Sequence, residues 1–234
     1  MLEAVLFDWG GTLMQFRWDD ELLTAGHRAG LDALGRGGEA AEFTARFRRE
    51  KLPALIEPGA PGLVDYGAEL RDLLGPVEED ELDRFLDAEH RAWRPSRSLV
   101  DSAHALLDSL RGRGLRLAVV SNTWPESARL VRLELAELGV ATRVDAVVLS
   151  GEVGARKPDP AIFRRALDEL AVDAAHALFV GDRLIDDVEG AAGVGMTTVQ
   201  ALWFRADDSP GKVEPDVRAF TPIDVLNSAR RLLT

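Results

Sequence analysis

Five short, almost continuously apolar runs constrain the fold more than any other feature of this sequence. They are AVLF (4–7), LRLAVVS (115–121), DAVVLS (145–150), ALFV (177–180) and TTVQALW (197–203). Such runs are typical of strands that are covered on both faces. Helical patterns occupy 102–114, 125–139, 159–172 and 186–195, and a short sixth strand at 215–220 and a closing helix at 222–233 complete the series. This alternation predicts an α/β fold with a Rossmann-like parallel sheet between layers of helices.

The interval between the first two runs is too long for one repeat. A strand–helix–strand unit takes roughly 30 residues or somewhat more, yet the first run ends at Asp8 and the second at Ser121. The surplus, residues 16–96, carries apolar residues at three- and four-residue spacing, which indicates helices. We therefore expect a core formed by 1–15 and 97–234, with an inserted α-helical domain at 16–96. Linkers are expected near 14–18 and 94–98.

Composition limits the classes of function. The chain has 234 residues and a formal net charge of −12, which argues against binding to nucleic acid or to an anionic membrane. It has no cysteine, which excludes disulfides and thiolate metal sites and favours a cytoplasmic location. The first apolar run is too short for a signal peptide or a membrane span. The sequence leaves the oligomeric state open.

Polar residues follow the predicted strands at the edge where ligands bind in open parallel sheets. They are Asp8 with a glycine turn, Ser121 and Asn122, Lys157, and the acidic group Asp182, Asp186 and Asp187. Each feature alone is also explained by a turn, a helix cap or a solvated loop. Their occurrence after four successive strands predicts one site that binds an anion together with a metal ion.

These motifs resemble those of the haloacid dehalogenase superfamily of hydrolases, and the resemblance covers nearly all of the chain. FDWGGTL (7–13) is similar to the first motif and Ser121 stands at the position of the second. GARKPDPAIF resembles the third motif, GDRLIDD resembles the fourth, and the helical insertion resembles the type-one cap of the family. The resemblance implies a hydrolase. The first hypothesis is a phosphatase that acts on a small phosphorylated metabolite.

The resemblance also implies a role for each matching residue. Asp8 would be the nucleophile and form an aspartyl-phosphate. Lys157 would neutralise charge, and Ser121 would donate to phosphoryl oxygens. A Mg²⁺ ion would shield the two anions from each other. The implied set is catalytic Asp8, Ser121 and Lys157; substrate-binding Thr12, Ser121, Asn122 and Lys157; and metal-binding Asp8, the Gly10 carbonyl, Asp182 and Asp187. Whether Asp186 or Asp187 is the second acidic residue stays open.

Gly10 is a departure from the family pattern. Most phosphatases of the superfamily carry an aspartate there, which protonates the leaving oxygen and later activates water. In one hypothesis the acid is replaced by His27, His90, Asp186 or water, and acyl or aryl phosphates are favoured substrates because their leaving groups hardly need a proton. The metal ligand at this position survives, because every residue has a carbonyl.

Three other hypotheses remain open. The chain could resemble phosphonoacetaldehyde hydrolases, whose first motif also has a small residue at this position; Lys51 would then form the Schiff base, although its strongly charged helix favours a solvated lysine. It could be a metal-free 2-haloacid dehalogenase, although the acidic GDRLIDD motif suits a cation better. It could also be a catalytically impaired protein that only binds phosphoryl groups.

The helical insertion is expected to close over the strand ends and contact the leaving group. Candidate contacts are Phe16, Trp18, His27, Arg91 and Trp93. The competing interpretation places Trp18 and Trp93 in the core of the insertion, and His27 and Arg91 in solvent.

Overall fold

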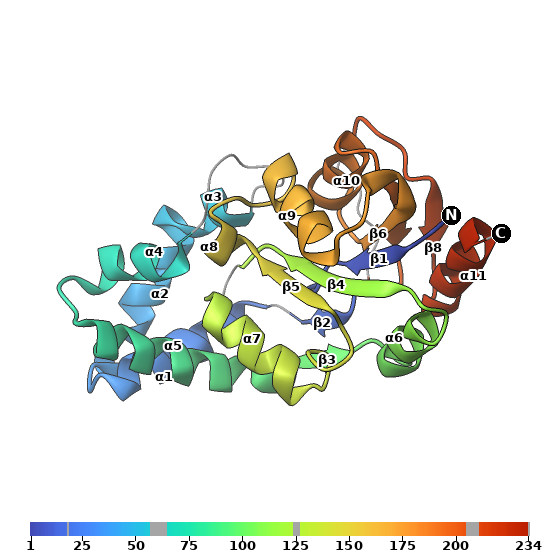
Figure 1. Ribbon diagram of the computed structural model, residues 1–234. Coiled ribbons are helices and arrows are strands. Elements are labelled where there is room, and N and C mark those ends of the chain that lie inside the picture. The colour runs from blue at the N-terminus through green and yellow to red at the C-terminus, as the bar shows by residue number, and fades with distance from the viewer. Residues whose placement is uncertain (18, 57–64, 124–126, 205–210, 234) are drawn as a thin grey trace.

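The computed structural model describes residues 1–17, 19–56, 65–123, 127–204 and 211–233. Six parallel strands form one sheet in the order β5-β4-β1-β6-β7-β8 (Figure 1). The strands are β1 (Ala4–Phe7), β4 (Arg116–Ser121), β5 (Ala146–Leu149), β6 (Ala177–Gly181), β7 (Thr197–Ala201) and β8 (Val217–Ala219). All five apolar runs and the predicted sixth strand at 215–220 form strands, so the predicted α/β fold is confirmed.

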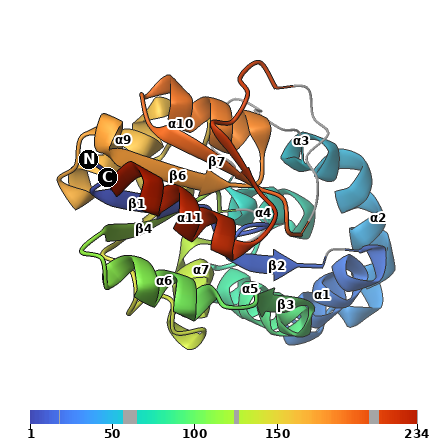
Figure 2. The same cartoon turned by 90° about the vertical axis from the view of Figure 1, so that its right-hand side faces the viewer.

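Helices cover both faces of this sheet, as the buried apolar clusters show. One cluster joins the sheet to α6 (Ala103–Arg111), α7 (Ala128–Glu137) and α11 (Pro222–Leu233). The other joins it to α9 (Pro160–Leu170) and α10 (Gly190–Gly193). The short helix α8 (Ser150–Val153) follows β5. The two chain ends lie side by side (Figures 1 and 2), and Leu2 N–H donates to Leu232 O there at 3.0 Å.

Five helices of the long interval between β1 and β4 pack around an apolar cluster of their own. They are α1 (Asp20–Ala33), α2 (Ala40–Glu50), α3 (Leu52–Ile56), α4 (Tyr66–Leu74) and α5 (Glu79–Trp93). Helix α1 approaches α5 closely because it has glycine at two facing positions. A Cβ on Gly26 would lie 2.2 Å from Trp93 Nε1, and one on Gly30 would lie 2.7 Å from the Phe85 ring. We call residues 20–93 the helical insertion.

The insertion leaves and re-enters the sheet domain through a two-stranded antiparallel ribbon. Its strands are β2 (Met14–Phe16) and β3 (Arg97–Leu99), with Phe16 paired to Arg97. The short 3₁₀ turn Arg94–Ser96 precedes β3. Ordered strands therefore stand where linkers were expected. The division of the chain into two domains at these positions stays a prediction.

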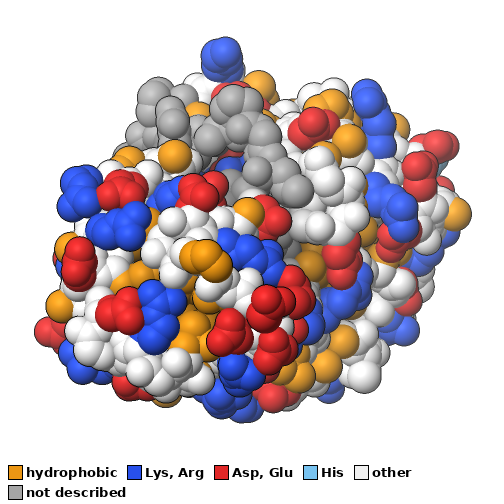
Figure 3. Space-filling model, turned by 90° about the vertical axis from the view of Figure 1, so that its left-hand side faces the viewer, with side chains coloured by type: hydrophobic (Ala, Val, Ile, Leu, Met, Phe, Trp, Pro, Cys, Tyr) orange, Lys and Arg blue, Asp and Glu red, His pale blue; other side chains and the backbone are white. Residues whose placement is uncertain are grey.

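The insertion also rests on the core helix α7. Leu130 of α7 belongs to the apolar cluster of the insertion. Arg129 of α7 pairs with Asp83 at 3.0 Å and with Asp87 at 2.8 Å, both on α5. On the face of the molecule that carries α4 and α5, acidic and basic side chains are interspersed (Figure 3). Within the described residues, no helix combines the length and apolar character needed to cross a lipid bilayer.

Candidate active site

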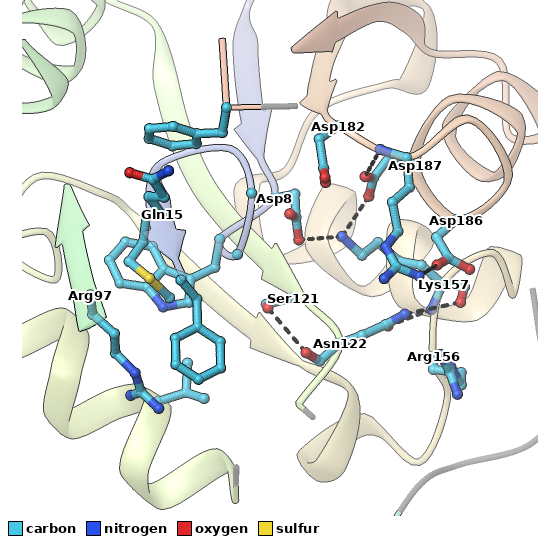
Figure 4. A pocket seen from close by; sticks show the side chains of 18 of the residues that line it. Asp8, Gln15, Arg97, Ser121, Asn122, Arg156, Lys157, Asp182, Asp186 and Asp187 are labelled. Atoms are coloured by element: carbon cyan, nitrogen blue, oxygen red, sulfur yellow. Dashed lines mark hydrogen bonds and ion pairs between the residues drawn. The ribbon is translucent and has the colours of Figure 1, made fainter. Parts of the chain in front are cut away.

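Asp8 directly follows β1, the central pairing partner of β4 and β6, so its side chain starts from the middle of the sheet edge. Lys157 reaches this point from the loop between α8 and α9. Its Nζ donates to Asp8 Oδ1 at 2.6 Å and to Asp187 Oδ1 at 2.6 Å (Figure 4). Lys157 and Asp187 are almost fully buried, with side chains 2% and 1% exposed. Three segments far apart in sequence thus meet in one buried ionic cluster.

Two glycines make room for these carboxylates. A Cβ on Gly181, at the end of β6, would lie 2.3 Å from the carboxyl carbon of Asp187. Gly11 has a φ of +93°, and a Cβ there would lie 2.5 Å from Asp182 Oδ2. Any larger residue would displace a carboxylate. Glycine is therefore required at these positions of FDWGGTL and GDRLIDD because a side chain would overlap the carboxylates.

Asp8, Asp182 and Asp187 form a group that could hold a metal ion. Each offers a carboxylate oxygen, and these atoms lie within 4.8 Å of one another. Three carboxylates beside one lysine leave an excess of negative charge, which a divalent cation would compensate. All the side-chain donors are oxygens, the ligand type that Mg²⁺ prefers. Asp187 belongs to this group, whereas Asp186 lies outside it and accepts from Arg183 Nη1 at 3.2 Å.

Burial and neighbouring charges shift the pKa of both members of the Asp8–Lys157 pair. Burial raises the pKa of Asp8 to about 7, opposed by the Lys157 ammonium and assisted by the carboxylates of Asp187 and Asp182. Burial alone would lower the pKa of Lys157, but the carboxylates of Asp187 and Asp8 outweigh it and raise the value. The lysine therefore stays charged, and the neighbouring carboxylates add to the cost of ionising Asp8.

Ser121 ends β4 and Asn122 follows it, and both line the same cavity as Asp8. Ser121 Oγ lies 3.3 Å from the Asn122 carbonyl oxygen, its acceptor. The Asn122 side chain holds the backbone of Lys157 from both sides: Oδ1 accepts from Lys157 N at 2.8 Å, and Nδ2 donates to Lys157 O at 3.1 Å. Asn122 was expected to bind substrate, but both atoms of its side-chain amide bind the backbone of Lys157 and position it. The sequence did not indicate this role.

Thr12 and Gly10, from the same turn, have different positions. Thr12 is fully buried and is not among the residues that line the cavity, so the structure does not bring it to the place expected for a substrate-binding residue. Its carbonyl instead accepts from Trp203 Nε1 at 2.9 Å. Gly10 does line the cavity, and a Cβ built on it meets no heavy atom within 4 Å. The place of the missing aspartate is open space.

The carboxylates face a cavity of about 530 Å³. Arg156 and Asp186 lie on the side of Lys157, whereas Gln15 and Arg97 lie on the other side of Asp8 (Figure 4). Apolar side chains form much of the remaining lining; they are Trp9, Met14, Phe16, Leu55, Val131 and Phe204. Sequence reasoning gave no role to Arg156, Arg97 or Glu134, which also line the cavity, because each lies in a segment whose charges are equally explained by solvation.

Most of the expected contacts from the insertion do not reach the cavity. Phe16 lines it. His27 is fully buried between Phe43 and Phe47, so its expected solvent exposure is wrong. Trp93 is fully buried, as the core interpretation predicts, and Arg91 is exposed. Neither His27 nor His90 lines the cavity, which removes both from the candidate acids, and Trp18 lies outside the described residues.

Lys51 does not line the cavity either. Its Nζ lies 2.7 Å from Glu69 Oε2 and 2.7 Å from Asp72 Oδ2, and its side chain is 15% exposed. The hydrogen bonds that it donates to Asp72 and Glu69 raise its pKa. The expected solvated lysine is thus an ion-paired one. A Schiff-base lysine must instead lose its proton, so this environment disfavours the phosphonoacetaldehyde hydrolase hypothesis.

Comparison with known proteins identifies the family. A family model for haloacid dehalogenase-like hydrolases matches residues 2–195. A phosphoglycolate phosphatase from Rhodospirillum rubrum is 44% identical over 215 residues, which cover 88% of this chain and 82% of the relative. A phosphoserine phosphatase from Thermus thermophilus is 40% identical over 191 residues, which cover 80% of this chain and 72% of the relative.

A solved structure agrees with these sequence matches. The haloacid dehalogenase (HAD) phosphatase from Thermococcus onnurineus superposes with a TM-score of 0.70 at 25% identity, covering 97% of this chain and 98% of that one. The match extends over the sheet and the helical insertion alike. The chain therefore belongs to the haloacid dehalogenase-like hydrolase family.

Proposed function

We propose that this protein is a Mg²⁺-dependent phosphatase that acts on a small phosphorylated metabolite through an aspartyl-phosphate on Asp8. The observation that carries the proposal is the buried contact of Asp8 with Lys157 beside two further carboxylates. The named activities of the similar proteins, a phosphoglycolate phosphatase and a phosphoserine phosphatase, support a phosphate monoester as substrate. Both names point to small metabolites rather than to macromolecules.

The proposed metal ligands are the carboxylates of Asp8, Asp182 and Asp187 and the backbone carbonyl of Gly10. When bound, Mg²⁺ would reduce the repulsion between Asp8 and the phosphate and stabilise charge on the phosphoryl oxygens. The oxygen-only donor set and its excess negative charge fit this ion. This arrangement is the main argument against the metal-free dehalogenase hypothesis.

The side chains divide the remaining work. Asp8 attacks phosphorus, and the bond between phosphorus and the leaving oxygen breaks. Lys157 keeps Asp8 oriented through Oδ1 and compensates negative charge. Ser121 donates a hydrogen bond from its hydroxyl to a phosphoryl oxygen once substrate replaces its present contact with the Asn122 carbonyl. Water then attacks the aspartyl-phosphate, which restores Asp8 and releases inorganic phosphate.

The leaving group has less help than the nucleophile. Of the acids considered for this step, Asp186 and water remain, because neither histidine lines the cavity. Asp186 is already hydrogen-bonded by Arg183. We therefore propose that substrates with acidic leaving groups, such as acyl or aryl phosphates, react fastest. An intact ionic cluster also argues against a catalytically impaired protein.

The test is release of inorganic phosphate from p-nitrophenyl phosphate and from a panel of phosphorylated metabolites, with Mg²⁺ and with EDTA. We expect release that requires Mg²⁺ and that falls at least about 10³-fold in Asp8→Asn, because loss of a nucleophile typically removes most of the rate enhancement. Equal release in EDTA, or an active Asp8→Asn variant, would refute the proposal. Borohydride treatment with phosphonoacetaldehyde should leave Lys51 unmodified.

A further inference from the structure

A chain of buried and partly buried polar contacts connects the turn after β1 to helix α5 of the insertion. Trp9 Nε1 donates to Glu134 Oε2 on α7 at 2.9 Å. Glu134 Oε1 accepts from Arg97 Nη1 on β3, also at 2.9 Å. The same Arg97 nitrogen lies 3.2 Å from His90 Nδ1 on α5. Residues 9, 90, 97 and 134 thus form one continuous network, although they come from four different elements.

The central ion pair of this network is unusually well buried. The side chains of Arg97 and Glu134 are 3% and 6% exposed. One turn further along α7, Glu137 pairs with Arg94 at 3.0 Å, with side chains 34% and 61% exposed. Burying an ion pair requires desolvation, and apolar residues often stabilise as well or better. Holding α7 near the insertion therefore does not require a buried pair, and Glu134 calls for a more specific explanation.

The position of Trp9 supplies that explanation. Trp9 stands between Asp8 and Gly10, whose carboxylate and carbonyl are two of the proposed metal ligands. The indole is 3% exposed and is held at its N–H by Glu134, and the Trp9 carbonyl accepts from Met14 N at 2.9 Å. Both the side chain and the backbone of this residue are thereby fixed.

We infer that Glu134 is a positioning residue for the metal site. By holding the Trp9 indole, it fixes the backbone on which the Asp8 carboxylate and the Gly10 carbonyl are carried. The inference rests on the proposed function, since it concerns the proposed Mg²⁺ ligands. Outer residues that orient metal ligands typically contribute 10–100-fold, as an order of magnitude, to metal affinity or activity.

Arg97 has a supporting part in this arrangement. Its guanidinium hydrogen-bonds Glu134 and lies 4.8 Å from the centroid of the Phe16 ring. Hydrogen bonds between charged groups are stronger than neutral ones, so Arg97 helps to hold the Glu134 carboxylate in place as the acceptor for the indole N–H. The contact of Arg97 with His90 adds the insertion to the same network. The insertion and the Asp8 turn therefore share one anchoring side chain.

The test is the Mg²⁺ dissociation constant by titration calorimetry in the absence of substrate, with kcat and KM measured in parallel. Trp9→Phe removes the indole N–H and leaves the ion pair of Arg97 and Glu134 in place. Glu134→Gln weakens the contacts on both sides. We expect both variants to bind Mg²⁺ about 10–100-fold more weakly and to lose kcat more than they raise KM.

Two matched variants serve as controls. Trp93→Phe removes an indole hydrogen bond of the same length, 2.9 Å to the Leu22 carbonyl, inside the insertion. Glu137→Gln weakens the exposed ion pair one turn along α7. Both are expected to keep the Mg²⁺ affinity of the wild type. Thermal unfolding without Mg²⁺ then separates a loss of folding stability from a loss of metal affinity.

The outcomes are distinguishable. If the wild type binds Mg²⁺ and Trp9→Phe binds it equally well, Glu134 has only a structural role and the inference is wrong, while the proposed function stands. The same conclusion follows if Trp93→Phe weakens Mg²⁺ binding as much as Trp9→Phe does. If the wild type itself binds no Mg²⁺, the proposed function fails and the inference fails with it. Should Glu134→Gln not fold, Trp9→Phe still decides the question.

Discussion

At the scale of single residues, Gly10 sets the chemical limits of the proposed mechanism. Asp8 has a lysine at 2.6 Å and two carboxylates close by, so the proposed nucleophile, its counter-charge and the proposed metal ligands lie together. The leaving group has no comparable partner. The backbone at Gly10 supplies a carbonyl but no proton, and proton donation to a poor leaving group is what an alkyl phosphate needs most.

Restoring an acid at this position is therefore predicted to change substrate preference. Gly10→Asp should raise kcat/KM for alkyl phosphates by at least about tenfold, within the roughly 10²–10⁴-fold range of positioned acid–base groups. It should raise kcat/KM for aryl phosphates far less. The cavity accepts the new side chain, because a Cβ on Gly10 meets no heavy atom within 4 Å. The measurement is a plot of log kcat/KM against leaving-group pKa, which should become flatter in the variant.

Gly10→Asn is the matched control, since it has nearly the same shape and no acidic proton. It should keep the steep dependence of the wild type. If Gly10→Asp and Gly10→Asn behave alike, or if both substrate classes gain equally, then no acid is missing at this position.

At the scale of secondary-structure elements, the sequence predicted what depends on local pattern. Five of the six strands were visible as apolar runs because both faces of a central sheet are buried. The ribbon of β2 and β3 was not visible in the sequence. Its strands are only three residues long, too short to show a periodicity, and Phe16 pairs with Arg97 from the far end of the insertion. The burial of His27 was also missed, since its ring packs against aromatic residues of another helix, α2.

His27 gives helix α1 a predicted pH dependence of stability. Burial, assisted by the nearby Arg48 charge, lowers the pKa of His27 from 6.5 to about 3. Its Nδ1 shares a hydrogen bond with Thr44 Oγ1 at 3.0 Å. Glu89 Oε1 is 3.6 Å from Nε2, beyond hydrogen-bond distance, so we expect burial to prevail. The folded state thus keeps the ring neutral, whereas the unfolded chain binds a proton below pH 6.5.

The contribution of neutral, buried His27 to the free energy of unfolding is therefore fully present above pH 6.5. It is lost as the pH falls from 6.5 towards 3. The loss is at most about 1.4 kcal/mol of unfolding free energy per pH unit. Urea unfolding at several pH values should show a shallower decline in His27→Gln than in the wild type across this window. Parallel curves for the two proteins would mean that Glu89 balances the burial of the ring.

At the scale of the whole molecule, the candidate site is assembled by contacts between segments far apart in sequence. The carboxylates and Lys157 could be assigned from sequence because all follow parallel strands, whose carboxyl ends share one edge. The network of Trp9, Glu134 and Arg97 could not. In the sequence, Glu134 is one of several charged residues of an amphipathic helix. It becomes an acceptor for the indole only because α7 packs against the turn after β1.

The pairing of Phe16 with Arg97 suggests a direct test of the predicted division into two domains. Replacing residues 17–96 with Asn-Gly would join β2 to β3 as a two-residue hairpin, the connection that suits the twist of paired strands. Leu130→Ser in the same variant would make polar a face that the insertion now covers. We expect the shortened protein to keep the far-ultraviolet circular dichroism of an α/β fold and a cooperative thermal transition.

The shortened protein should still bind Mg²⁺, because the proposed ligands Asp8, Asp182 and Asp187 all lie outside the insertion. Its affinity should fall by less than about the 10–100-fold expected for Trp9→Phe, since Trp9, Glu134 and Arg97 are retained and only His90 is lost from their network. Discrimination between small and large phosphate esters should narrow, because the insertion no longer limits access to the cavity. A chain that fails to fold would show that residues 17–96 are part of the structural core rather than a separate domain. A chain that folds with unchanged substrate discrimination would show that the insertion does not limit access to the cavity.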